Sequence, residues 1–306
     1  MIGYLCAYLR YYYPYEFITA YLNNADNEDD TKNGNELATL YGIKIIPPKF
    51  GISKDEYVFD KEKKVIAKGL SSVKYMNAKV AIELFELAKR EKPKSFMDLL
   101  LSAKETHMDS RKMDVLIKID FFSEYGNSKE LLRIADLFSF FKNGDAKTIA
   151  KDKLKPDLLE VVSQFGNDIS KQGKPLKKYT ITDMPGLLNC CEAKIKEMNI
   201  DDFDMRSKIN NQLEMLGYID LTTGKETDRR KLLITDVFPL RGRESNEIWA
   251  YAISTRSIGS GKVSRLTVRS FIYDSDPIKR FDIIYASDIY KDKKGYWNLA
   301  KYYHVS

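Results

Sequence analysis

Long apolar runs, paired cysteines and clustered histidines are all missing from this sequence. No apolar stretch approaches the roughly twenty residues that a membrane span needs, and the first residues lack the features of a signal peptide. Cys6, Cys190 and Cys191 have no paired spacing, which excludes a disulfide framework and a zinc site. His107 and His304 have no partners at metal-ligand spacing. These absences favour a cytoplasmic protein.

Motifs for phosphoryl-transfer chemistry are missing as well. The sequence has no Gly-rich phosphate loop that ends in Lys-Ser/Thr. Residues 201–204 (DDFD) form the most acidic local cluster, but they precede a predicted helix, where acidic residues interact favourably with the helix dipole. A helix cap therefore explains the cluster better than a metal site does. We expect no catalytic residues, bound metal or cofactor in this chain.

The composition is that of a folded protein with several compact units. Of the 306 residues, 43% are hydrophobic and 31% are charged, which provides both packed cores and charged surfaces. The net charge of +6 is modest, so its effect depends on clustering: on one face, the cations would attract phosphate backbones.

Helical patterns fill the first two thirds of the chain. Ala81, Leu84, Phe85 and Ala88 recur at helical spacing and predict an amphipathic helix, and another helical pair is predicted over 95–122. The polar stretch 24–34 predicts a loop. From 127 to about 216 we predict helices broken by Lys/Gly-rich joints, one of them at 171–175.

The pattern changes to alternating apolar and aromatic residues after Lys231. Runs near 231–239, 247–256, 263–273, 281–289 and 296–304 predict short strands. Five strands in about eighty residues fit an OB-like β-barrel, although another small barrel or a sandwich has the same strand count. The predicted fold class is α+β multidomain, with a mostly helical first part followed by the barrel.

The barrel strands carry a predicted binding surface. Alternation places one set of side chains on a single face of the third strand, namely Arg265, Thr267, Arg269, Phe271 and Tyr273. Trp249, Tyr251 and Ile253 share a face of the second strand. Aromatic rings beside arginines stack on bases and neutralise phosphate in single-strand recognition. The alternative is that Trp249 and Tyr251 are barrel core.

Cations also gather in the predicted turns between these strands. Arg241 and Arg243 follow the first strand, Arg256 and Lys262 flank the second turn, and Lys293 lies in the last. These turns border the binding face of an OB barrel.

Three stretches resemble the alpha subunit of bacterial DNA polymerase III, a C-family replicative polymerase, and they occur in that family's order. The first is 7–17 (AYLRYYYPYEF), which is similar to part of the fingers. The second is 42–48 (GIKIIPP), followed by 57–59 and 68–70, and the third is 111–122 (RKMDVLIKIDFF). The second stretch is similar to that family's transition from the fingers to the helix-hairpin-helix elements, and the third to its second hairpin element. A weaker match, 213–218, resembles the segment before its OB domain.

The resemblance implies DNA binding at the hairpins, with departures. Tyr75 and Asn77 stand where the family places two glycines, and Asp120 and Phe121 replace a glycine and a small residue. Residues 134–138 (IADLF) lack the Gln of its sliding-clamp motif, which makes clamp binding doubtful and a buried helix face the better interpretation. The hairpin contacts that we predict are Lys74, Asn77, Arg111 and Lys112.

The implied organisation is a fingers-like segment (1–60), a tandem helix-hairpin-helix region (61–126), a helical connector (127–224) and an OB domain (225–306). By resemblance, the chain would hold primer-template and single-stranded template DNA. The palm carboxylates that would bind Mg²⁺ are not found in this sequence, so polymerase activity is not expected from this chain alone. A separate palm-bearing polymerase chain is one candidate partner.

Other interpretations remain open. The alternatives are a standalone single-stranded nucleic-acid-binding protein and a replication scaffold, and a mobile element is one origin for such a protein. The tyrosines of residues 7–17 could stack on bases, but rings at helical spacing more often pack against other side chains.

Overall fold

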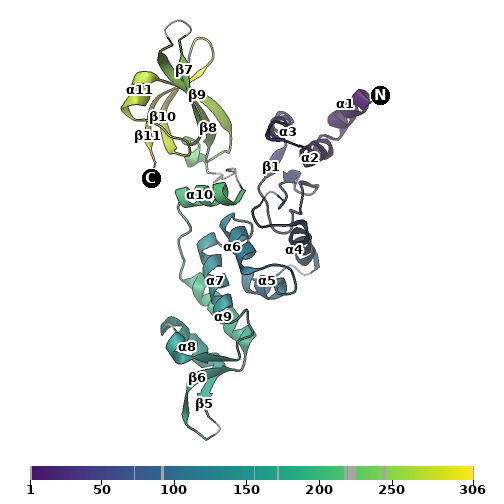
Figure 1. The fold of residues 1–306 in the computed structure, drawn as a ribbon, viewed down its shortest axis with the longest axis vertical. Coiled ribbons are helices and arrows are strands. Elements are labelled where there is room, and N and C mark those ends of the chain that lie inside the picture. Colours follow the sequence, from purple (N-terminus) through teal and green to yellow (C-terminus); the bar gives the residue numbers. More distant parts are fainter. Residues whose placement is uncertain are drawn as a thin grey trace. The chain divides into compact units, whose positions relative to one another are not determined.

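The computed structural model describes residues 2–71, 73–90, 93–154, 156–170, 172–216, 219, 225–242 and 246–305. These form two compact units, one built from 1–204 with 214–216 and the other from 205–213 with 217–306 (Figure 1). Among the described helices, none has both the length and the hydropathy that crossing a bilayer demands.

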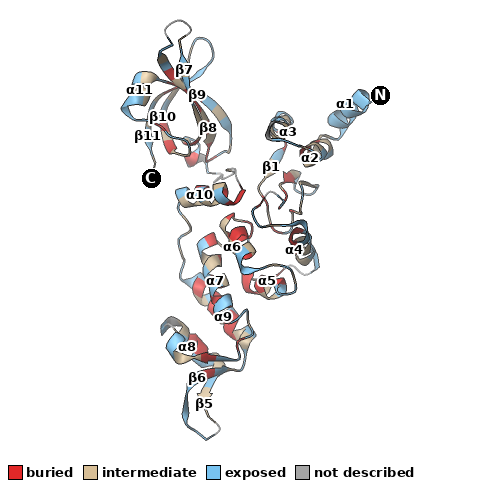
Figure 2. Ribbon diagram, viewed as in Figure 1, coloured by how far each residue is buried: buried red, intermediate tan, exposed pale blue. Residues whose placement is uncertain are grey.

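The first unit begins with helices α1 (Ile2–Tyr12), α2 (Pro14–Asn23) and α3 (Glu28–Leu40) and a small sheet. Its strands β1 (Lys44–Ile46), β2 (Val58–Asp60) and β3 (Val65–Ala67) have the order β1–β3–β2. Pro14 starts α2, where its missing N–H costs nothing. Ile18, Leu22 and Ile66 form the local core, whereas α1 buries none of its residues (Figure 2).

The loop predicted over residues 24–34 is wrong from Glu28 onward, where α3 begins. The Asn27 side chain accepts a hydrogen bond from the Asp30 N–H at 2.9 Å and so caps the helix. A capping side chain can therefore start a helix in a polar segment that has only a narrow apolar stripe.

The predicted helices of the central region are confirmed as α4 (Ala78–Arg90), α5 (Phe96–Ala103) and α6 (Ser110–Lys118), followed by α7 (Ser128–Phe140). Each begins at a capping side chain that accepts a backbone N–H bond: Asn77, Ser95, Asp109 and Asn127. Phe96, Phe121 and Phe122 are fully buried between these helices. Phe121, which replaces a small family residue, is therefore part of the core.

Two non-glycine residues adopt left-handed backbone conformations at the hairpins. Tyr75 has φ +64° and Asp120 has φ +60°. After α6, the Asp120 N–H donates to Ile117 and the Phe121 N–H donates to Leu116, which is a Schellman ending. The Ser128 hydroxyl donates to Asp120 Oδ1 at 2.6 Å. This bond helps to stabilise Asp120 in a left-handed conformation that glycine adopts more readily. Asn77 is a helix cap and does not share this conformation.

The stretch after α7 contains a small sheet that the helical prediction missed. Strands β4 (Thr148–Ala150), β5 (Gly166–Ile169) and β6 (Pro175–Ile181) have the order β4–β6–β5, and the 3₁₀ turn η1 (Lys151–Lys153) and helix α8 (Pro156–Phe165) lie between β4 and β5. Residues 171–175 were predicted to be a joint between helices. Instead, the described part of this segment belongs to a β-hairpin, since the Ser170 N–H donates to the Lys174 carbonyl at 2.8 Å.

Helix α9 (Met184–Glu197) returns the chain to the central helices through a buried carboxylate. Glu192 accepts hydrogen bonds from the N–H groups of Phe96 and Met97, at 3.2 and 3.0 Å, and an ion pair with Lys196 completes its environment. With Ser95 bonded to the Asp98 N–H, three donors at the start of α5 are satisfied.

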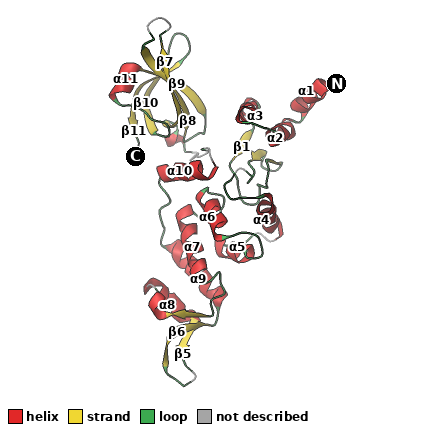
Figure 3. Cartoon of the chain, in the orientation of Figure 1, coloured by secondary structure: helices red, strands yellow, loops and turns green. Residues whose placement is uncertain are grey.

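The second unit is a closed five-stranded barrel, which confirms the predicted architecture (Figure 3). Its elements are β7 (Lys231–Arg241), β8 (Ile248–Ser257), β9 (Val263–Arg269), α11 (Ser270–Ser275), β10 (Ile283–Lys291) and β11 (Trp297–His304), with η2 (Glu226–Asp228) before β7. The order β10–β11–β9–β8–β7, with β9 parallel to β11 and a helix after the third strand, is that of an OB-fold. Ile209 of α10 (Met205–Leu216) packs on Leu233 outside the barrel core.

Replacing Glu192 should destabilise the first unit strongly. In Glu192→Ala, two buried N–H groups lose their acceptor, and we expect the free energy of unfolding to fall by about 2–4 kcal/mol. Urea denaturation monitored by circular dichroism measures this change. Glu197→Ala, an exposed position in the same helix, should shift stability by less than about 0.5 kcal/mol. Equal effects of the two substitutions would contradict the role of Glu192.

Candidate nucleic-acid interface

The outer surface of strands β7, β8 and β9 brings cations and aromatic rings together. Strand pairing places Phe238 opposite Ala252, and Ala252 opposite Thr267, while Ala250 lies opposite Arg269. Side chains at paired positions point to the same face. Alanines in the middle strand leave room for long side chains from β7 and β9 to lie across it. We call Phe238, Trp249, Arg265 and Arg269 the barrel face.

Each arginine of the barrel face lies near an aromatic ring. The Arg265 Cζ is 5.9 Å from the Phe238 ring centroid, and the Arg269 Cζ is 5.4 Å from that of Trp249. Both rings are partly open to solvent, with Phe238 45% and Trp249 46% exposed. Exposed rings beside guanidinium groups can stack on bases while the cations neutralise phosphates.

Trp249 reaches this face because of a β-bulge. The pairing passes from Leu240–Ala250 to Arg241–Ile248, so Trp249 is an additional residue on β8. A bulge re-aims the side chain of such a residue. Strict alternation placed Trp249 with Tyr251 and Ile253, but Ile253 belongs to the barrel core.

The predicted third strand is too long, which corrects two residue assignments. Strand β9 ends at Arg269, and Phe271 and Tyr273 lie on α11 instead. Ile272 and Tyr273 are consecutive, yet both pack on the barrel core, which a helix permits and an alternating strand does not. Phe271 is exposed on α11.

Tyr251 lies against Tyr273, away from the barrel face. The two rings stack with centroids 3.7 Å apart, and the Tyr273 hydroxyl donates to the Ile278 carbonyl at 2.7 Å. Burial is the main cause that raises the pKa of Tyr273. The structure therefore places Tyr251 and Tyr273 in a packed aromatic pair, as the core alternative anticipated for Tyr251.

The turns around the barrel face hold several predicted cations. Arg241 donates to the Asn246 carbonyl at 3.0 Å in the β7–β8 connection, while Arg243 lies outside the described residues. Arg256 is half-buried, opposite the exposed Val263. The remaining two predicted cations, Lys262 and Lys293, are exposed in turns.

The β10–β11 turn is ordered by a carboxylate. Asp292 accepts the N–H groups of Lys294 and Tyr296, both at 2.9 Å. The Tyr296 N–H is the main cause that holds the pKa of Asp292 below its ordinary value. Beside this turn, the Lys291 Nζ is 5.6 Å from the ring centroid of the half-exposed Trp297.

The helix-hairpin-helix residues show a different pattern. The Arg111 Cζ lies 3.6 Å from the Tyr75 ring centroid, and both side chains are exposed. Lys112 donates to Asp109 at 2.6 Å and to the His107 carbonyl at 3.1 Å, so its charge is partly used within the fold. Lys74 is exposed, but its backbone N–H donates to the Met215 carbonyl.

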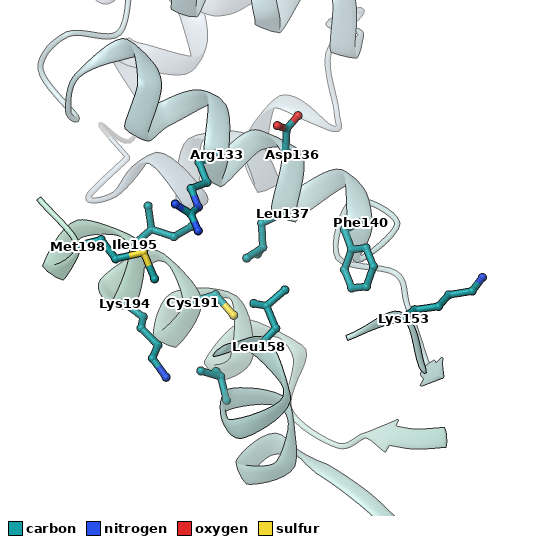
Figure 4. A pocket seen from close by; sticks show the side chains of 11 residues that line it. Arg133, Asp136, Leu137, Phe140, Lys153, Leu158, Cys191, Lys194, Ile195 and Met198 are labelled. Carbon is teal, nitrogen blue, oxygen red and sulfur yellow. The ribbon is translucent and has the colours of Figure 1, made fainter. Parts of the chain in front are cut away.

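An apolar pocket of about 330 Å³ lies between α7, α8 and α9 (Figure 4). Its lining includes Leu137, Val161 and Cys191, and burial raises the pKa of the Cys191 thiol to about 12. Leu137 belongs to the 134–138 stretch, whose Ile134 and Phe138 are also buried, as predicted for a helix face. Within the described ranges, no three acidic, histidine or cysteine side chains gather in a metal-binding group.

Comparison with known proteins supports the interpretation of the central region. A family model described as "Helix-hairpin-helix motif" matches residues 42–132. A DNA polymerase III subunit alpha of Buchnera aphidicola is 31% identical over 236 residues, which cover 75% of this chain and 18% of that protein. The chain is thus similar to DNA polymerase III alpha subunits.

Further alpha subunits match shorter stretches. That of Halalkalibacterium halodurans is 31% identical over 46% of the chain, and that of Campylobacter jejuni is 28% identical over 43%. The chain spans only 11% to 18% of the length of these three alpha subunits.

Tyr251 should prove structural rather than nucleic-acid-binding. In Tyr251→Leu, loss of the stack with Tyr273 should lower the free energy of unfolding by about 1–3 kcal/mol. Thermal denaturation measures this loss. In fluorescence anisotropy with a labelled oligonucleotide, the variant should bind with the same affinity as the parent protein. Phe271→Ala, an exposed aromatic truncation, is the stability control. A folded Tyr251→Leu protein with weakened binding would contradict this assignment.

Proposed function

We propose that this chain binds DNA as a non-catalytic part of a polymerase III alpha-like system, and that the barrel face holds single-stranded template. The observation that carries the proposal is the pairing of two exposed aromatic rings with two exposed arginines on the β7–β9 surface. Strands 2 and 3 and the connections beside them are the surface that OB-folds use for oligonucleotides. The relationship to DNA polymerase III alpha subunits favours DNA over RNA.

The helix-hairpin-helix region would hold the duplex part of a primer-template. Exposed Lys74 and Arg111 offer cations there, and phosphate contacts fix register without reading sequence. Tyr75 has a left-handed backbone conformation. Its bulky ring lies where a close approach of the hairpin backbone to phosphate would need glycine. Contacts in this region should therefore come from side chains rather than from a hairpin backbone pressed against phosphate.

The exposed α1 helix favours a further partner over the standalone alternative. Ile2, Tyr4 and Tyr11 are more than two-thirds exposed, and contiguous apolar surface of this kind marks interfaces. A palm-bearing polymerase chain is the partner that the family relationship suggests. Reconstitution tests this: the chain should increase nucleotide incorporation by a palm-bearing chain, and Tyr4→Ser with Tyr11→Ser should reduce the gain.

Removing the barrel-face arginines should weaken single-strand binding and its salt dependence. In Arg265→Ala and in Arg269→Ala, we expect the slope of log affinity against log salt to fall by about 1 each. Trp249→Ala should cost about 1–3 kcal/mol of binding free energy through lost stacking. Fluorescence anisotropy with a labelled oligo(dT) at several NaCl concentrations measures all three effects.

Lys279→Ala is the matched control, because it removes an exposed cation of the same barrel from the connection between α11 and β10 rather than from strands β7–β9. It should leave the slope close to that of the parent. If Arg265→Ala, Arg269→Ala and Lys279→Ala bind alike, the assignment of the barrel face is wrong.

A further inference from the structure

A two-stranded ribbon extends from the small sheet of the first unit. Strand β4 pairs with residues 178–180 of β6, whereas β5 and β6 pair with each other near the turn at Ile169–Pro175. Two hydrogen bonds close the turn: the Ser170 N–H donates to the Lys174 carbonyl at 2.8 Å, and the Gly173 N–H donates to the Ser170 carbonyl at 2.9 Å. In Figures 1 and 3, β5 and β6 continue past the end of α8.

The ribbon is strongly basic. Residues 166–181 contain one acidic residue, Asp168, and a larger set of lysines, Lys171, Lys174, Lys177 and Lys178. Asp168 pairs with Lys151 of η1 at 2.6 Å, and this hydrogen bond is the main cause that lowers the pKa of its carboxyl. The acidic charge is thus neutralised from outside the ribbon, while Lys174, Lys177 and Lys178 are exposed.

The lysines point to both faces of the ribbon. Consecutive strand residues alternate, so Lys177 lies on the face of the buried Tyr179 and Lys178 lies on the opposite face. A surface that tracks one phosphate backbone needs cations on one face only. Cations on both faces suit a site with phosphates on two sides.

Apolar side chains at the far end of the ribbon lack a core. Ile169 is 56% exposed and Leu176 is 39% exposed, although both lie next to the turn. An isolated two-stranded ribbon is marginally stable in water, so contact with a partner would stabilise it. Such side chains can contact sugars and thymine methyl groups in a DNA groove.

These observations identify one kind of partner. The major groove of duplex DNA, about 12 Å wide, admits a two-stranded β-ribbon and is flanked by phosphates on both sides. We propose that the β5–β6 ribbon inserts into the major groove of double-stranded DNA, with Lys177 and Lys178 directed to opposite phosphate backbones. This contact goes beyond the binding of single strands by the barrel face and does not depend on it.

Substitution of the lysine pair in the full chain tests the proposal. Lys177→Ala with Lys178→Ala should reduce the salt slope for a labelled 20-base-pair duplex by about 2, because each neutralised phosphate contributes about 0.9. Affinity for labelled oligo(dT) should remain that of the parent. Both lysines are exposed, and circular dichroism will show whether the variant keeps its fold.

A charge-matched control is Lys61→Ala with Lys63→Ala, two exposed lysines of the β2–β3 turn in the same unit. This pair should leave the duplex slope unchanged. Three results would overturn the proposal: an unchanged slope in the ribbon variant, an equal loss in the control variant, or an equal loss on duplex and oligo(dT). The first would point to an acidic protein partner for the ribbon, and the third to general electrostatics.

Discussion

The Glu192 carboxylate determines how the central helices fit together. It accepts the first two N–H groups of α5, so a residue 96 positions later in the chain completes the start of that helix. Buried donors must be satisfied, and among the described residues next to Phe96 in sequence the Ser95 hydroxyl accepts the N–H of Asp98. The hairpins that precede and follow α5 are attached to this cluster of central helices.

Sequence patterns predicted the parts of the fold that local rules control. Helix α4 was clear from its apolar stripe, and the barrel strands were clear from alternation and turn residues. The small sheet around β6 was missed, because its residues are polar and lysine-rich and only Tyr179 and Ile149 face a core. The first turns of helix α3 were missed because capping by Asn27, rather than an apolar pattern, starts the helix.

The candidate site could be predicted only in part. Alternation placed Arg265 and Arg269 together on a face opposite the buried Leu266 and Val268. It misplaced Trp249, since a bulge is invisible to strict periodicity, and it overlooked Phe238, whose role depends on the pairing of β7 with β8. The helical turn at Ser270–Ser275 required knowing that Ile272 and Tyr273 pack on the same core.

The segment between α7 and α9 can vary in length without changing the central helices. Helices α7 and α9 pack against each other, while the segment between them forms its own sheet with α8. Lengthening or shortening the ribbon would therefore leave Glu192 and the helix cluster in place. Insertions or deletions in the ribbon would alter the proposed contact with duplex DNA without disturbing the hairpins.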